Sequence, residues 1–266
     1  MKPLQIASCM AENSETLCSS IAEILEIQLG IPFEYVTGMP WQEREQLFDA
    51  GEIPILWLCG LPYVDKADAA ESSVELLAVP VPVGPRYHGR PVYFSDIVVQ
   101  RQSPFESFID LHGAAWAYNE PRSHSGFNVV RAFLAEIGQY QGFFGNAVES
   151  GTHANSIELL LSGAVDGTAI DSTVLAWFLS HRLDLDDHLR VIDTIGPSPI
   201  PPWVISKKMP GSVRAQIRQS LLRLHLSPMG QAALAQAQLA KFTVAHDRDY
   251  DPIRRMARKA APVLLA

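Results

Sequence analysis

The stretch NEPRSHSGFNVV, Asn119 to Val130, sets two serines and a histidine in consecutive positions ahead of a glycine and an apolar run. The apolar spacing predicts a helix over Ser125–Gly138, and the run before it predicts a strand over Ala114–Tyr118. Parallel α/β sheets bind ligands at such turns, beyond the carboxyl ends of their strands. The stretch therefore predicts an α/β fold with a ligand-binding edge.

The same alternation of strand-like and helix-like segments runs outward in both directions. Short apolar runs predict further strands over Leu4–Met10, Phe33–Thr37, Pro54–Cys59, Val74–Val81, Val92–Gln100, Asn146–Glu149, Gly167–Ile170, Leu189–Thr194 and Trp203–Lys208. Amphipathic periodicity predicts further helices over Ser14–Leu29, Trp41–Phe48, His153–Leu161 and Thr173–His181, and two or three more within Gly211–Lys241 and Asp251–Leu265.

This order predicts two α/β lobes, each a mostly parallel sheet with flanking helices and right-handed crossovers. We expect residues 1–100 and 201–266 to form the first lobe and residues 101–200 the second. The lobes would be joined near Val99–Pro104 and near Ile195–Pro202. Two such connections predict a ligand cleft between the lobes and hinges that close it.

Composition narrows the class of partner. The 266 residues are 47% apolar and 19% charged, which is typical of a globular protein. A formal charge of -8 argues against nucleic acid or an anionic membrane as the main partner. A small anion remains compatible, since backbone N–H groups and hydroxyls bind anions without net positive charge. The three cysteines predict neither a disulfide framework nor a zinc site, and we expect no metal or cofactor.

The start of the chain contains no recognisable export signal, because no apolar segment of sufficient length precedes Cys9. The longest apolar run, Ile55–Val64, is about half of a membrane span. We therefore expect a periplasmic or cell-surface protein if the chain is a mature fragment, and a cytoplasmic one if it is full length.

Polar side chains gather where three strands of the second lobe end. The candidate ligand-binding residues there are Ser123, His124, Ser125, Thr152, His153 and Asp171. Each loop opens a helix, whose first turn offers unpaired N–H groups and the positive end of the dipole. Two such helix starts predict a cradle for a tetrahedral oxyanion. Alternatively, the serines and Thr152 serve only as N-caps.

Other readings of these residues stay open. A serine hydrolase would need a strained elbow, and neither Ser123 nor Ser125 has a glycine two residues before it. A metal site is disfavoured because the spacing enforces no coordination geometry. His153 either contacts the ligand or bonds a neighbouring carbonyl. Asp171 either accepts a proton from a protonated oxyanion, accepts a hydrogen bond from a ligand substituent, or only caps the next helix.

The first lobe offers three aromatic residues with polar handles, Trp41, Tyr63 and Tyr93. These side chains would cover the ligand as a lid. Core packing is the alternative, and it is the more frequent role of aromatic residues.

The chain resembles the PhnD-type phosphate and phosphonate-binding proteins of ABC importers. The resemblance covers most of the length, through the segments CGLPYV (Cys59–Val64), YFSDIVVQRQSPF (Tyr93–Phe105), NEPRSHSG (Asn119–Gly126), SGTHANSIELLLSGAVDGTAID (Ser150–Asp171) and SPIPPWVISKKMP (Ser198–Pro210). Family members carry an acid-Pro-x-Ser-x-Ser-Gly loop, which Glu120–Gly126 match, and a Gly-Ser/Thr-His helix start, which Gly151–His153 match.

The resemblance implies a two-lobed periplasmic-binding-protein fold of type II and no catalysis. It also implies capture of a small oxyanion (phosphate, phosphite or a phosphonate) for the permease of an ABC importer, and we expect a monomer. Two departures bear on the ligand. His124 stands where the family has a serine or threonine, and PIPPW lacks the acid that would bind a cationic ligand tail. A ligand-sensing module and an enzyme acting on a phosphorylated or carboxylated compound remain alternatives.

Overall fold

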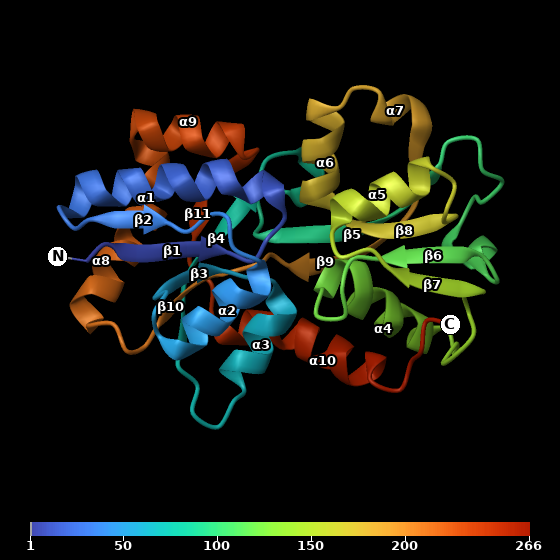
Figure 1. The fold of residues 1–266 in the computed structure, drawn as a ribbon, viewed down its shortest axis with the longest axis horizontal. Coiled ribbons are helices and arrows are strands. Elements are labelled where there is room, and N and C mark those ends of the chain that lie inside the picture. The colour runs from blue at the N-terminus through green and yellow to red at the C-terminus, as the bar shows by residue number, and fades with distance from the viewer. Residues whose placement is uncertain (1) are drawn as a thin grey trace. The chain divides into compact units, whose positions relative to one another are not determined.

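The computed structural model describes residues 2–266, which form two compact units (Figure 1). Unit 1 comprises the residues up to Val92 together with Pro199–Tyr250, and unit 2 comprises Tyr93–Ser198 together with Asp251–Ala266. The chain thus passes from one unit to the other three times.

Unit 1 is built on a six-stranded sheet in the order β11-β4-β10-β3-β1-β2. Its strands are β1 (Leu4–Ser8), β2 (Phe33–Tyr35), β3 (Ile55–Trp57), β4 (Val74–Pro82), β10 (Trp203–Ser206) and β11 (Leu239–Thr243). Its helices are α1 (Glu15–Leu29), α2 (Trp41–Ala50), α3 (Gly60–Ala67), α8 (Gly211–Leu222) and α9 (Pro228–Gln236). Strand β1 runs parallel to β2 and β3, whereas β10 and β11 pair antiparallel to their neighbours.

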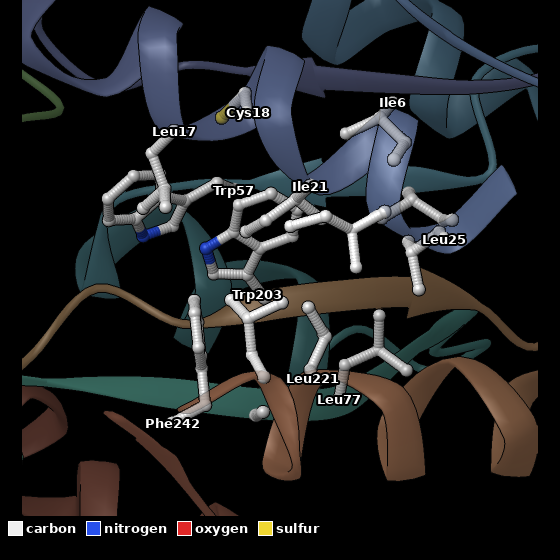
Figure 2. Packing of buried hydrophobic residues seen from close by; sticks show 14 of the residues in the cluster. Ile6, Leu17, Cys18, Ile21, Leu25, Trp57, Leu77, Trp203, Leu221 and Phe242 are labelled. Carbon is white, nitrogen blue, oxygen red and sulfur yellow. The ribbon is translucent and has the colours of Figure 1, made fainter. Parts of the chain in front are cut away.

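The core of unit 1 forms where α1, α8 and α9 cover one face of this sheet (Figure 2). Leu17, Ile21 and Leu25 recur at intervals of four and point from α1 onto the sheet, where Trp57 and Trp203 stack with ring centroids 5.5 Å apart. Burying each such side chain contributes roughly 1.5–3 kcal/mol. The apolar stripe of the sequence therefore fixes this face of α1.

Unit 2 is built on a five-stranded sheet in the order β7-β6-β8-β5-β9. Its strands are β5 (Val92–Gln100), β6 (Ala115–Tyr118), β7 (Asn146–Glu149), β8 (Gly167–Asp171) and β9 (Leu189–Pro199). Its helices are α4 (Val129–Glu136), α5 (His153–Leu161), α6 (Ser172–His181), α7 (Leu185–His188) and α10 (Asp251–Ala260). Helices α4 and α10 lie on one side of this sheet and α5 and α6 on the other (Figure 1).

Both sheets are mixed, with antiparallel strands beside the parallel ones that the sequence predicted. In unit 1, β10 and β11 return to the sheet antiparallel, and in unit 2 β5 pairs antiparallel with β8. Strand β11 also replaces part of the helix expected over Gly211–Lys241. Strand direction depends on the path of long connections, which the residue pattern of a single strand does not reveal.

The unit boundaries also differ from the expected ones. Strand β5 belongs to unit 2 because it pairs with β8, and the residues after Tyr250 belong there because Val263 and Leu265 enter the core around Trp116. The chain accordingly changes units at residues 92–93, 198–199 and 250–251. Only the second change lies in a segment that the sequence predicted.

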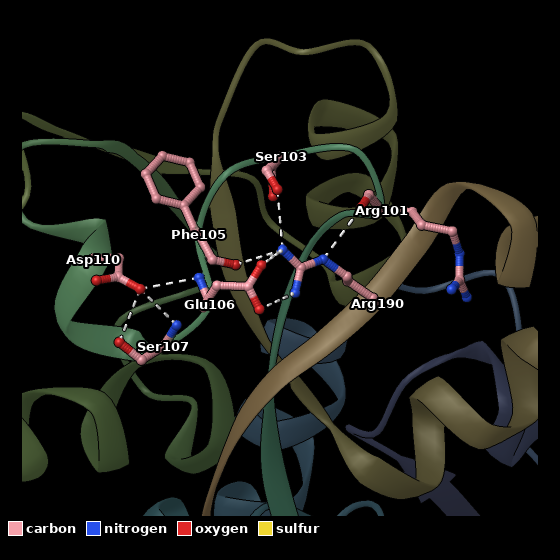
Figure 3. Close-up of polar contacts among 7 residues, drawn as sticks. All are labelled: Arg101, Ser103, Phe105, Glu106, Ser107, Asp110 and Arg190. Carbon is pink, nitrogen blue, oxygen red and sulfur yellow. Dashed lines mark hydrogen bonds and ion pairs between the residues drawn. The ribbon is translucent and has the colours of Figure 1, made fainter.

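The segment near Val99–Pro104, expected to act as a hinge, is held inside unit 2 by Arg190 of β9 (Figure 3). The guanidinium of Arg190 donates to the carbonyl oxygens of Arg101 (3.2 Å), Ser103 (3.0 Å) and Phe105 (2.7 Å) and forms an ion pair with Glu106 at 3.2 Å. Three carbonyls on one planar group fix the path of this turn. These contacts lie within unit 2, and the chain changes units before this segment, at residues 92–93.

Candidate functional site

Three neighbouring strands of unit 2 end at one edge of its sheet. Strand β6 runs parallel to β7 on one side and to β8 on the other, with Tyr118 opposite Glu149 and Ala117 opposite Thr168. Parallel strands end on the same side, so the loops that follow them come together. The expected convergence of the three polar loops is therefore present.

The loop after β6 turns into a helix at SHSG. Ser123 caps the turn, and its hydroxyl accepts the Gly126 N–H at 3.1 Å. The first turn, η4 (His124–Asn128), is π-helical, and the Asn128 N–H reaches back to the Ser123 carbonyl at 3.0 Å. Such wide turns occur frequently at functional sites. The N-cap interpretation thus holds for Ser123, because its hydroxyl oxygen accepts a backbone N–H of the helix.

The loop after β7 forms the second helix start. The Thr152 hydroxyl accepts the Asn155 N–H at 3.0 Å and so caps α5. His153 is the first residue of that helix, and its Nε2 lies 3.2 Å from the Ser125 Oγ. This hydrogen bond joins the two helix starts. Sequence reasoning placed both residues in the cradle, and the structure brings them into contact.

His153 is a neutral residue at ordinary pH. Its side chain is 6% exposed, and burial lowers its pKa to about 4 because the charged form loses water. A serine beside a histidine resembles a nucleophile and its base. A base with such a low pKa takes a proton poorly near pH 7, so the pair is suited to binding rather than to attack.

His124 lies entirely inside unit 2. Its Nδ1 is 3.0 Å from the Asn128 amide nitrogen and its Nε2 is 3.0 Å from the Ser198 hydroxyl. Burial lowers its pKa to about 3. Both ring nitrogens therefore form hydrogen bonds within unit 2. The bond to Asn128 joins His124 to the other end of the same π-helical turn.

Asp171 follows β8 and caps α6. Its Oδ1 accepts the Thr173 N–H at 2.8 Å and the Thr173 hydroxyl at 2.7 Å. Burial raises its pKa to about 6, and the nearby Asp96 carboxylate adds to this rise, whereas the bonds from Thr173 oppose it. The two alternatives for Asp171 are compatible, because a cap uses one of its oxygens here.

The three aromatic candidates have separate surroundings. Tyr93 belongs to unit 2, not to the first lobe as expected, and is buried with its ring edge-on to His124 at 6.4 Å. In unit 1, Tyr63 is also buried, and its hydroxyl donates to Asp247 at 2.8 Å. Trp41 begins α2 and is half-buried. Core packing thus accounts for the burial of Tyr63 and Tyr93.

Sequence reasoning missed the amides around the two histidines. Asn128 bonds His124, and Asn119 packs against Gly126 beside His153. Both asparagines stand in the NEPRSHSGFNVV stretch. Their presence in the same stretch as His124 was the feature of the sequence that could have indicated these amide contacts. Within residues 2–266, no three or more His, Cys, Asp or Glu side chains are placed to hold a metal ion.

Solved structures show the same architecture. A binding-protein component of an ABC phosphonate transporter from Pseudomonas aeruginosa matches with a TM-score of 0.82 at 16% identity, over 98% of this chain and 87% of that one. PhnD1 from Prochlorococcus marinus in complex with methylphosphonate matches with a TM-score of 0.82 at 18% identity, over 98% and 99% of the two chains. A Xanthomonas citri protein bound to ATP matches with a TM-score of 0.74 at 15% identity, over 98% of each.

The fold is thus that of a type II periplasmic binding protein, as expected from the resemblance. Residues 7–250 match the family described as ABC transporter, phosphonate, periplasmic substrate-binding protein. The chain belongs to this family, and it is a solute-binding protein. Across residues 2–266, none of the helices combines the length and the apolar character that crossing a membrane requires.

Proposed function

We propose that this protein captures a small alkylphosphonate, or a phosphite or phosphate of similar shape, through the two helix starts of unit 2. The hydrogen bond of 3.2 Å between Ser125 and His153 carries the proposal, because it draws the SHSG and GTH starts together. Each start presents N–H groups to an anion. Thr152 stands at the second start, as the cap of α5.

The donors of this cradle are neutral, which suits a chain with a formal charge of -8. Backbone N–H groups and hydroxyls bind an oxyanion through direction and dipole, and the neutral imidazole of His153 orients the Ser125 hydroxyl among them. The methylphosphonate complex of the Prochlorococcus marinus relative supports this ligand class.

The proposed ligand tail is apolar rather than cationic. An ammonium group enclosed by protein needs a carboxylate, since burying an unpaired charge costs several kcal/mol. Among the candidate residues Asp171 is the only carboxylate, one of its oxygens is occupied by the cap of α6, and Pro199–Trp203 carries no acid. We therefore propose that alkyl substituents are preferred to aminoalkyl ones.

We further propose that the protein acts as a monomer in the periplasm and delivers its ligand to the permease of an ABC importer. Membership of a periplasmic substrate-binding family supports this role. We propose that it catalyses no reaction, because His153 is too weak a base to activate Ser125 near pH 7.

Isothermal calorimetry with phosphate, phosphite, methylphosphonate, propylphosphonate and 2-aminoethylphosphonate tests the ligand class. A ligand present at 100 times its dissociation constant should stabilise the protein by roughly 2.7 kcal/mol, which a thermal-shift measurement detects independently. Propylphosphonate should bind more tightly than 2-aminoethylphosphonate of equal chain length. Absence of binding by the whole panel would remove the proposal, and the reverse order of these two ligands would refute the apolar tail.

A further inference from the structure

Asn119 touches both helix starts of the cradle. It directly follows β6, and its backbone carbonyl accepts the Gly151 N–H at 2.7 Å, which holds the loop before His153. Its side chain lies against Gly126. A Cβ at residue 126 would overlap the Asn119 Oδ1 and lie 3.0 Å from its Cγ and 3.3 Å from the His153 Cε1. The Asn119 amide and the His153 ring therefore border the same small space, which only glycine leaves open.

Two buried polar atoms at this space lack a hydrogen-bond partner within the described chain. They are the Asn119 Oδ1 and the His153 Nδ1. An unsatisfied buried polar atom is costly, so a pairing between neighbours is favoured. A half-turn of an amide exchanges its oxygen and nitrogen, so the Asn119 side chain can present N–H donors to this space in place of its oxygen.

The same unit already contains such an arrangement at its other buried histidine. The Asn128 amide nitrogen lies 3.0 Å from the His124 Nδ1, and the His124 Nε2 lies 3.0 Å from the Ser198 Oγ. An amide nitrogen only donates, so Nδ1 accepts and the ring proton resides on Nε2. His153 shows the second half of this chain, with its Nε2 3.2 Å from the Ser125 Oγ.

We propose that Asn119 is a positioning residue of the ligand site, whose amide donates to the His153 Nδ1 and so places the imidazole proton on Nε2, facing Ser125. The Ser125 oxygen accepts that proton in a hydrogen bond and turns its own O–H towards a ligand oxygen. In the opposite tautomer, Ser125 would donate to His153 and present only lone pairs to an anion. This inference deepens the proposed function and rests on it.

Nitrogen NMR of histidine-labelled protein without ligand tests the tautomer, with His153→Gln to assign the signals. The wild type should show His153 with Nδ1 unprotonated and Nε2 protonated. Asn119→Asp offers only an acceptor and should place a proton on Nδ1. Asn155→Ala is the matched control, because that amide donates to the Ser150 carbonyl at 2.7 Å in the same loop and should leave the tautomer unchanged.

Asn119→Leu should weaken methylphosphonate binding roughly three- to tenfold, as expected for one lost hydrogen bond, whereas Asn155→Ala should change it less than about twofold. A protonated Nδ1 in the wild type, an unchanged tautomer in Asn119→Asp, or unchanged affinity in a folded Asn119→Leu would each overturn the inference. If Asn119→Leu does not fold, the two tautomer measurements decide. The tautomer measurements need no ligand. Failure of the wild type to bind any oxyanion would therefore contradict the proposed function without deciding the tautomer.

Discussion

His124 should make the stability of the protein depend on pH. Burial lowers its pKa from 6.5 to about 3 in the folded chain. The unfolded chain therefore binds the proton more tightly. The contribution of the neutral imidazole is complete above the unfolded value and is lost as pH falls towards the folded one.

The size of the effect follows from the two pKa values. A pH of 4.5 is about two units below the pKa of the unfolded histidine, and each unit of pH is worth about 1.36 kcal/mol. His124 alone should cost roughly 3 kcal/mol between pH 7.5 and pH 4.5. His153, with a pKa of about 4, acts in the same direction, whereas Asp171, with a pKa raised to about 6, acts in the opposite one.

A comparison of variants isolates His124 from these other groups. Urea unfolding at both pH values gives the free energy of unfolding of the wild type and of His124→Gln. The variant should be less stable at pH 7.5, where it lacks the imidazole bonds, and the gap should narrow by roughly 3 kcal/mol at pH 4.5. His246→Gln, at an exposed position, is the control. An equal gap between wild type and His124→Gln at both pH values would refute the neutral, buried imidazole.

Three further results are expected. Ser125→Ala and His153→Ala should each weaken methylphosphonate binding about tenfold or more in calorimetry, because Ser125 donates a hydrogen bond to the charged ligand, worth roughly 1.5–3 kcal/mol, and His153 orients that hydroxyl; unchanged affinity in both would move the site elsewhere. Gly126→Ala should lower the free energy of unfolding by about 1–3 kcal/mol, because its methyl group overlaps the Asn119 amide, whereas Gly211→Ala, with its nearest neighbouring atom 3.7 Å away, should not. Methylphosphonate should lower the radius of gyration in small-angle scattering if the units close about the chain crossings at 92–93, 198–199 and 250–251, and a constant radius would contradict closure.

Elements with a strong local pattern were predictable from the sequence. Strands β5 and β7 and helix α5 begin and end at the expected residues. Helix α5 keeps one apolar spacing through Ile157 and Leu160, and β5 and β7 are short runs bounded by turn residues, so local pattern is enough to place all three.

Elements that depend on distant partners were not predictable. The segment Leu239–Thr243 continues an alanine-rich helical pattern, yet it is a strand because it pairs antiparallel with β4. The assignment of β5 to unit 2 depends likewise on its pairing with β8. Tertiary pairing outweighs local preference in both cases.

The location of the polar edge was predictable, but the direction of its side chains was not. Parallel strands explain why the SHSG and GTH loops meet, and residue order is enough to infer this. The first turn, His124–Asn128, is π-helical and therefore wider than an α-helical turn. The spacing of an ordinary α-helix consequently does not predict the direction in which each of its side chains points. His124 consequently bonds inside unit 2, whereas Ser125, the next residue, meets His153.

If the proposed site is correct, the two buried histidines explain how an acidic protein holds an anion without relying on cations. Burial keeps both imidazoles neutral near pH 7, so each ring has one donor and one acceptor nitrogen. At His124 an asparagine settles which nitrogen donates, and the ring then fixes Ser198. At His153 the same choice decides whether Ser125 offers a proton or a lone pair to the ligand. Affinity for an oxyanion would thus depend on the orientation of neutral dipoles, which in turn requires that burial keep the histidines uncharged.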